Sequence, residues 1–149
     1  MQATPAVDDD TVPLSGQSRI NQLQVIAGTN TAYPLATAYK LKTAFGSDML
    51  FSAQKATRQG IMLTHLKRWY ENAEILKMAT GTNGELLALS GPRNPYPGKL
   101  GVIEEGAFAD LLVVDGDPTA DIALVENPEK NFLIIMKDGK IYKNTLSSR

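Results

Sequence analysis

Residues 99–143, KLGVIEEGAFADLLVVDGDPTADIALVENPEKNFLIIMKDGKIYK, decide the fold. Short β-prone runs occur in this stretch at residues 100–103, 109–114, 132–136 and 140–142. The run 109–114 is nearly continuously apolar, as is typical of a strand buried on both faces. Asp138-Gly139 separates the last two runs and predicts a hairpin, because a type I′ turn needs positive φ at both central residues. The sequence therefore predicts a small sheet that must pack on another element, since a few short strands bury little alone.

A more specific pattern covers residues 100–118. It resembles the C-terminal signature of the amidohydrolase superfamily, the metal-dependent hydrolases built on a TIM barrel, and the matching positions are Gly101, Ile103, Gly106, Ala109, Asp110, Leu111 and Asp115. Residues 131–144 resemble the closing hairpin of that family, and residues 42–50, KTAFGSDML, resemble the end of its last barrel strand. The nearest branch is the imidazolonepropionase-like and Xaa-Pro dipeptidase-like proteins.

The length of the chain limits what the resemblance implies. The chain has 149 residues, whereas a complete TIM barrel needs roughly 250. We therefore expect an α/β fold that is a C-terminal fragment of a TIM-barrel amidohydrolase, starting in mid-barrel as a gene fragment or truncated copy. In this division residues 1–17 form a loop or disordered tail. Residues 18–90 form a partial (β/α) barrel with the last barrel strand and its helices, and residues 91–149 form a small β-sandwich-type subdomain.

The middle of the chain is expected to be helical around one short strand. The predicted helices span residues 18–27 (ended by Gly28), 30–40, 53–70, 71–79 and 82–89, and the strand spans 41–45. Gly60 lies inside the third helix, where glycine costs about 1 kcal/mol relative to alanine. A close contact with another backbone would explain that glycine.

Composition argues against several classes of function. The chain carries 15 basic and 16 acidic residues, so no electrostatic footprint for nucleic acid is present. It has no cysteine, which rules out disulfides and thiolate metal sites. No apolar run approaches the roughly 20 residues of a membrane span. The first residues also lack the features of a secretory signal, which leaves the cytoplasm as the default expectation.

The resemblance assigns a chemical role to Asp48. Members of the family hold one or two metal ions, zinc above all, at the carboxyl ends of the barrel strands. Their ligands are a His-x-His pair, a Lys or Glu, two further His, and an Asp after the last strand that also relays the proton. Asp48 matches that Asp by its place in Gly46-Ser47-Asp48, so it is the predicted catalytic residue and, in a completed barrel, a metal ligand. The alternative is an ordinary turn Asp, since Asp favours such positions.

The remaining metal ligands of the family have no counterpart in the sequence. His65 is the one histidine; it falls within the predicted helix 53–70, matches no ligand position, and is expected to be a partly exposed helix residue. Asp8-Asp9-Asp10 lacks the glycine and the glutamate of an EF-hand loop and is interpreted as a solvated acidic loop. The complete enzyme is thus expected to use a divalent metal, whereas this chain alone is expected to bind none.

Arg93 and Tyr96 stand in the proline-rich loop 90–98 and form a second candidate site. Arg93 is suited to a substrate carboxylate, because the guanidinium group can bind both carboxylate oxygens. The alternative is an external connector between barrel and sheet. Trp69 and Tyr70 are interpreted as packing residues.

Three functional hypotheses follow. The first is a segment of a metal-dependent amidohydrolase that hydrolyses amide, peptide or cyclic amide bonds through a metal-activated water and is inactive alone. The second is a half-enzyme completed by a separate chain that supplies the missing N-terminal barrel half. The third is a non-catalytic β module for assembly, with self-association through segment 100–143, since open strand edges and apolar faces recruit other chains.

Overall fold

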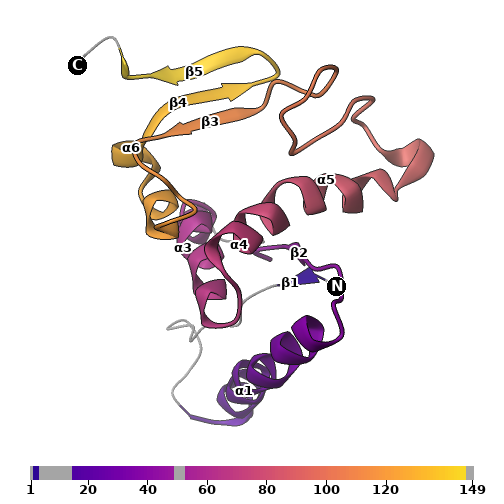
Figure 1. Ribbon diagram of the computed structural model, residues 1–149. Coiled ribbons are helices and arrows are strands. Elements are labelled where there is room, and N and C mark those ends of the chain that lie inside the picture. The colour runs from indigo at the N-terminus through magenta and orange to yellow at the C-terminus, as the bar shows by residue number, and fades with distance from the viewer. Residues whose placement is uncertain (1, 4–14, 49–52, 147–149) are drawn as a thin grey trace.

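The computed structural model describes residues 2–3, 15–48 and 53–146, and it is a mixed helical and β structure (Figure 1). The acidic run Asp8-Asp9-Asp10 lies outside these residues. The α-helices are α1 (Gln17–Ala38), α2 (Ala53–Ala56), α3 (Gln59–Thr64), α4 (Asn72–Ala79), α5 (Gly81–Ala88) and α6 (Pro128–Asn131), and the 3-10 helices are η1 (His65–Arg68), η2 (Gly91–Arg93) and η3 (Ile122–Glu126). The strands are β1 (Gln2–Ala3), β2 (Ala44–Phe45), β3 (Leu111–Val114), β4 (Phe132–Lys137) and β5 (Lys140–Asn144).

The first sheet is a short parallel pair. Gln2 pairs with Ala44 and Ala3 with Phe45. The prediction of a loop or disordered tail over residues 1–17 is therefore wrong at Gln2–Ala3, because the backbone of these two residues pairs with β2. The predicted strand 41–45 is also shortened to its last two residues. Its first residue instead closes α1: Lys40 has φ 52°, and Leu41 N–H donates to Ala36 C=O at 2.8 Å, which is the 6→1 bond of a helix C-terminal cap.

The second sheet has the order β3-β4-β5 and is antiparallel throughout. The predicted hairpin at Asp138-Gly139 is confirmed, with φ of 49° and 72° at the two residues. The prediction that β3 is buried on both faces is wrong, because Leu112 is 54% and Val113 41% exposed. Within the described chain β3 has one strand neighbour, β4, which leaves its other edge open.

The strand predicted at 100–103 does not form. One isolated bridge, Lys99 to Ala107, lies beside it. Gly101 has φ 70°, and a Cβ there would lie 2.3 Å from the backbone carbon of Thr80. The proline-rich loop 90–98 includes the single 3-10 turn η2.

The predicted helix break at Gly28 is wrong, since α1 runs continuously through Gly28 and Pro34. Among the described residues, no atom outside the neighbouring turns of α1 lies within 4 Å of where a Cβ at Gly28 would be, so the helix has room to continue through this position. The predicted helix 53–70 is instead three pieces, α2, α3 and η1. The break is followed by Gly60, where a Cβ would lie 2.1 Å from Val125 O. The predicted backbone contact at Gly60 is thereby confirmed.

The helices α4 and α5 agree with prediction to within a residue or two. The N-cap of α4 is Glu71, which forms a capping box with Glu74. Asn72 Nδ2 donates to the carbonyl oxygens of Thr119 and Ala120 at 3.1 and 3.0 Å. This side chain therefore ties α4 to the segment that precedes η3.

The core lies among α1, α3, η1, α4 and η3, and consists of Tyr33, Leu63, Leu66, Ile75, Met78 and Ile122. Trp69 and Tyr70 pack against it, with the Trp69 ring 4.5 Å from that of Tyr33 in an edge-on contact, as expected for packing residues. In the second sheet Leu133 is 8% exposed. None of the helices in the described ranges is long and apolar enough to cross a membrane. The division of the chain near residue 90 stays a prediction.

Candidate functional site

Asp48 lies three residues beyond the end of β2. Phe45, the last residue of that strand, packs against the core, Gly46 and Ser47 are half-buried, and Asp48 is exposed. The backbone of Asp48 has φ 50°, a left-handed conformation that is uncommon outside glycine but enriched for Asp. Asp48 thus follows the carboxyl end of a strand in a parallel pair, in a conformation that its residue type tolerates.

The described residues do not by themselves fit a metal ion. Residues 2–3, 15–48 and 53–146 contain no group of three or more His, Cys, Asp or Glu side chains able to hold one, and zinc needs three or four protein ligands. Asp48 supplies one carboxylate.

His65 stands where α3 passes into η1, and its side chain is half-buried, in line with the expected partly exposed residue. Its Nδ1 is buried and has no hydrogen-bond partner in the described structure. Burial lowers the pKa of His65; Glu126 opposes this shift, while Arg68 and Arg58 add to it. Beside it, Thr64 Oγ1 donates to Glu126 Oε1 at 2.6 Å, so His65 belongs to the contact between α3 and η3.

Arg93 and Tyr96 do not join Asp48 in one site. Arg93 is exposed at the end of η2, and the Tyr96 ring meets that of Phe108 edge-on, with centroids 6.1 Å apart. Figure 1 shows the segment after α5 far from the end of β2.

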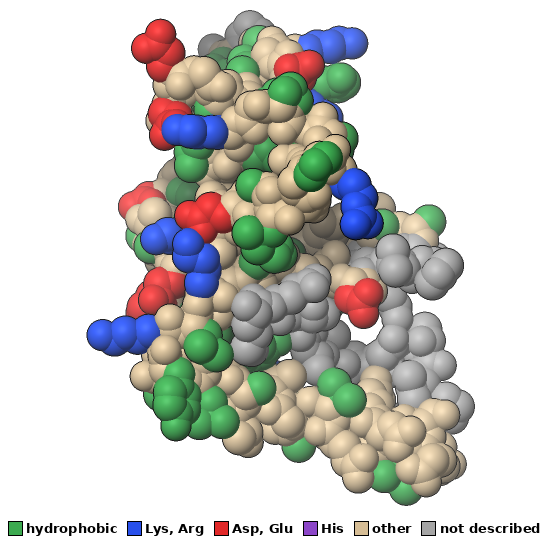
Figure 2. Space-filling model, turned by 90° about the vertical axis from the view of Figure 1, so that its right-hand side faces the viewer, with side chains coloured by type: hydrophobic (Ala, Val, Ile, Leu, Met, Phe, Trp, Pro, Cys, Tyr) green, Lys and Arg blue, Asp and Glu red, His purple; other side chains and the backbone are tan. Residues whose placement is uncertain are grey.

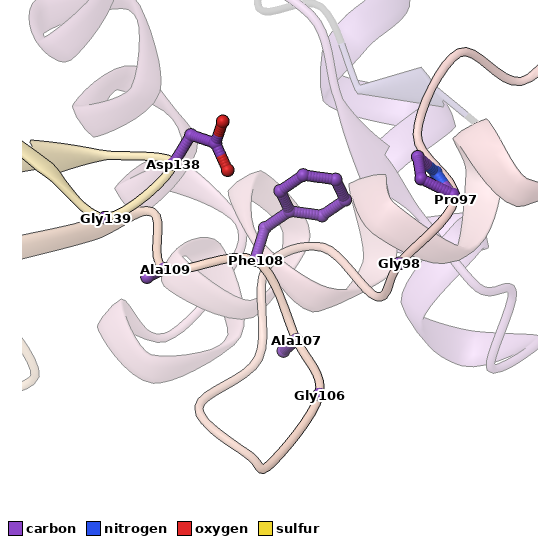
Figure 3. A pocket seen from close by; sticks show the side chains of 8 residues that line it. All are labelled: Pro97, Gly98, Gly106, Ala107, Phe108, Ala109, Asp138 and Gly139. Atoms are coloured by element: carbon purple, nitrogen blue, oxygen red, sulfur yellow. The ribbon is translucent and has the colours of Figure 1, made fainter.

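Phe108, the ring partner of Tyr96, borders an open pocket of about 500 Å³. Its lining residues are Pro97, Gly98, Gly106, Ala107, Phe108, Ala109, Asp138 and Gly139 (Figure 3). The Asp138 carboxylate points toward the Phe108 ring across this pocket. Sequence reasoning missed the pocket, because its two walls come from segments about 30 residues apart. A phenylalanine between glycine turns was the one local signal.

Charges of both signs are interspersed on the surface. Figure 2 shows acidic and basic side chains mixed over one face, with apolar side chains between them. The exposed pair Lys42 and Glu85 is one example, and its hydrogen bond lowers the pKa of Glu85. This face presents no large field of one sign.

No family model matches the chain, and no curated protein matches it. Solved structures do. An amidohydrolase crystal structure is 25% identical with a TM-score of 0.78, over 97% of this chain and 34% of that chain. A prolidase complexed with N-methylphosphonate-L-proline is 27% identical with a TM-score of 0.70, over 85% of this chain and 29% of that chain. Ochratoxinase from A. niger, 20% identical with a TM-score of 0.71 over 90% of this chain and 29% of that chain, shares the fold.

These neighbours confirm the resemblance read from the sequence. The chain has the fold of part of an amidohydrolase or prolidase chain, consistent with the C-terminal portion of the amidohydrolase superfamily. It spans about a third of the length of the solved structures that it matches.

Proposed function

We propose that the chain contributes Asp48 to a metal-dependent amidohydrolase that hydrolyses carbon–nitrogen bonds, and that it is inactive alone. The observation that carries the proposal is the place of Asp48, just after a strand that pairs in parallel with another. Active sites of TIM barrels form at the carboxyl ends of such strands. The similarity to an amidohydrolase and a prolidase supports the class of reaction.

The role proposed for Asp48 is proton transfer. Its carboxylate would take a proton from the attacking water and return it to the departing nitrogen, a function typically worth 10²–10⁴-fold in rate. The other groups of the site would come from residues outside the described part of this chain. Together with Asp48 they would hold the zinc expected in the complete enzyme.

The proposed substrate is an amide or peptide bond. The prolidase neighbour binds a phosphonate that carries L-proline, which favours a bond to proline nitrogen. A cyclic amide, as the imidazolonepropionase-like half of the branch would imply, is the alternative. Arg93 and Tyr96 stay a weaker proposal for substrate contact, because the segment that carries them lies far from the end of β2.

A chimera tests the role of Asp48. The matching segment of the solved prolidase is replaced by this chain, and kcat is measured with and without Asp48→Ala. We expect a loss of at least about 10²-fold with the fold retained, while the neighbouring substitution Ser47→Ala has a small effect. A near-unchanged kcat in Asp48→Ala would show that Asp48 is only a turn residue.

The chain alone should bind no stoichiometric zinc and hydrolyse no dipeptide, since one carboxylate is far from a complete ligand set. Elemental analysis that found about one zinc per chain, lost in Asp48→Asn, would contradict this. Activity restored by a separately expressed N-terminal barrel half would favour the half-enzyme.

A non-catalytic assembly module is the second candidate, favoured by the exposed apolar residues of the second sheet, such as Leu112 and Tyr142. A stable, metal-free oligomer that no N-terminal barrel half activates would support it.

A further inference from the structure

Glycine follows an aspartate or asparagine three times in the sequence, at Asn83-Gly84, Asp115-Gly116 and Asp138-Gly139. Such pairs can rearrange spontaneously in water, because glycine has no side chain to keep its nitrogen away from the preceding side-chain carbonyl and its backbone turns readily. In a folded protein the rate depends on how firmly that nitrogen is held. The three pairs lie in three different settings, so the structure ranks them.

Asp115-Gly116 lies just beyond the end of β3 and is exposed. Asp115 N–H donates to Asn131 C=O at 2.8 Å, but Gly116 N–H donates to no acceptor among the described residues. Gly116 has φ 121°, and a Cβ there would lie 2.9 Å from Leu124 Cδ1. The fold therefore favours glycine at 116 and leaves its nitrogen without a hydrogen bond.

Asp138-Gly139 places the same two residue types in the hydrogen-bonded turn between β4 and β5. Gly139 N–H donates to Ala109 C=O at 3.1 Å, and Asp138 N–H donates to Asp110 Oδ1 at 2.6 Å. The Asp138 carboxylate points toward the Phe108 ring (Figure 3). Attack by the Gly139 nitrogen on this carboxyl group would first require loss of the bond to Ala109, so the turn protects the pair.

Asn83-Gly84 is protected by helix α5. Gly84 N–H donates to Thr80 C=O at 2.9 Å, and a Cβ at Gly84 would lie 2.4 Å from Leu100 O. The Gly84 nitrogen therefore turns toward the Asn83 side chain only if the helix opens. Asparagine is the more reactive residue in a flexible chain, but here its backbone is fixed.

We propose that Asp115 is a site of spontaneous isoaspartate formation in the folded chain. The Gly116 nitrogen attacks Cγ of the protonated Asp115 carboxyl group. The carboxyl OH leaves with the proton of that nitrogen as one water molecule, and a succinimide ring remains. This modification does not involve Asp48, so its test does not depend on the hydrolase proposal.

Water then opens the succinimide ring at one of its two carbonyl groups. Cleavage of the new N–Cγ bond restores aspartate, whereas cleavage of the original peptide bond leaves the chain running through Cγ as isoaspartate. The product has the mass of the starting chain and one extra main-chain carbon just beyond β3. The same reaction is not available at Asp117, because the nitrogen of Pro118 carries no hydrogen.

The test incubates the full chain in mildly acidic buffer and maps the products by proteolysis and electron-transfer fragmentation, which gives fragments specific to isoaspartate. We expect isoaspartate to form at least about tenfold faster at Asp115 than at Asp138, because the hydrogen bonds of the turn must break before the second pair reacts. Asn83 should stay unmodified in the same samples.

Urea provides the control for the flanking sequence. In the unfolded chain the two Asp-Gly pairs have lost their different hydrogen bonds, so they should react at similar rates. Asp115→Glu keeps the charge but would need a larger ring, and it should abolish the signal at 115.

Two variants at Asp110 test the protection of Asp138. Asp110→Ala removes the acceptor of Asp138 N–H and should raise the rate at Asp138 toward that at Asp115, which stays unchanged. Asp110→Asn keeps a side-chain oxygen as acceptor and should leave both rates as they are. Circular dichroism checks that both variants are folded.

Three results would overturn the proposal. One is isoaspartate that forms at Asp138 as fast as at Asp115 in a folded chain. Another is an unmodified Asp115 in the folded chain when the same pair reacts in urea. The third is a ratio between the two sites that urea leaves unchanged, which would assign the difference to the flanking sequence and not to the fold.

Discussion

The helical core and the second sheet are both built from apolar runs, yet one closes and the other does not. Leu66, Ile75 and Ile122 have no exposed surface, because α3, η1, α4 and η3 surround them. In the sheet, Leu112 is 54% and Ile141 49% exposed. The comparison teaches that an apolar run becomes core only where a second element covers it.

The largest expected effect comes from breaking the contact between α3 and η3 inside the helical core. Gly60→Val places a side chain where a Cβ would lie 2.1 Å from Val125 O, so α3 and η3 must separate. We expect a loss of about 3 kcal/mol or more in unfolding free energy, beyond ordinary overpacking, measured by urea unfolding.

The matched control is Gly28→Ala in α1, where the site of the new Cβ is open. It should stabilise the chain by about 0.5–1 kcal/mol. Equal effects of the two substitutions would show that the Gly60 contact is not tight.

The second prediction compares the same truncation in the two regions. Leu66→Ala should cost about 2–5 kcal/mol, as for other buried leucines, whereas Leu112→Ala should change the stability by about 0.5 kcal/mol or less, as for exposed sites. Thermal melts of both variants test this. Comparable losses would mean that the sheet is covered in solution.

The third prediction concerns the uncovered sheet. The chain should self-associate through segment 100–143 by way of β5, where Ile141 and Tyr142 are 49% and 63% exposed; each large side chain buried contributes about 1.5–3 kcal/mol. Sedimentation should show oligomers that Ile141→Lys disperses and Leu112→Lys does not. A monodisperse monomer at high micromolar concentration with a sharp melt would refute this.

The fourth prediction is a pH dependence of the core region. His65 has a lowered pKa when folded, so the folded chain binds fewer protons than the unfolded chain just below pH 6.5. Its contribution is therefore complete above pH 6.5 and is lost as pH falls toward the folded pKa. His65→Gln should flatten this part of the curve of stability against pH, and an unchanged slope would exclude His65 as its source.

The smallest effect is expected at the surface pair of Lys42 and Glu85, whose side chains are 72% and 57% exposed. Lys42→Ala should change the unfolding free energy by about 0.5 kcal/mol or less. A larger loss in chemical unfolding would mean that Lys42 does more than pair with Glu85.

The features predicted correctly are those fixed by local chemistry. Asp138-Gly139 specifies its own turn, and a glycine inside a helix at Gly60 implied a backbone neighbour. The strand expected at 100–103 failed because contact with Thr80, 21 residues earlier, holds Gly101 at positive φ. No local pattern contains that contact.

Of the candidate site, the sequence located Asp48 by its motif, but it could not show what lies near it. The pocket lined by Phe108 and Asp138 could not be predicted, for the same reason as the conformation of Gly101. Its walls come from separate segments of the sequence, which meet only after the hairpin folds back. The exposure of Leu112 agrees with the open apolar face expected for segment 100–143, whereas the apolar run taken alone suggested burial on both faces.

The contact between Gly60 and Val125 also makes unequal demands on the two residues. It is the Val125 carbonyl, a group common to all amino acids, that touches Gly60, so other apolar side chains are acceptable at 125 while only glycine fits at 60. The contact between α3 and η3 therefore depends on the residue type at one position, Gly60. Residue 125 can then vary among apolar side chains without loss of this contact, which is compatible with a TM-score of 0.78 at 25% identity.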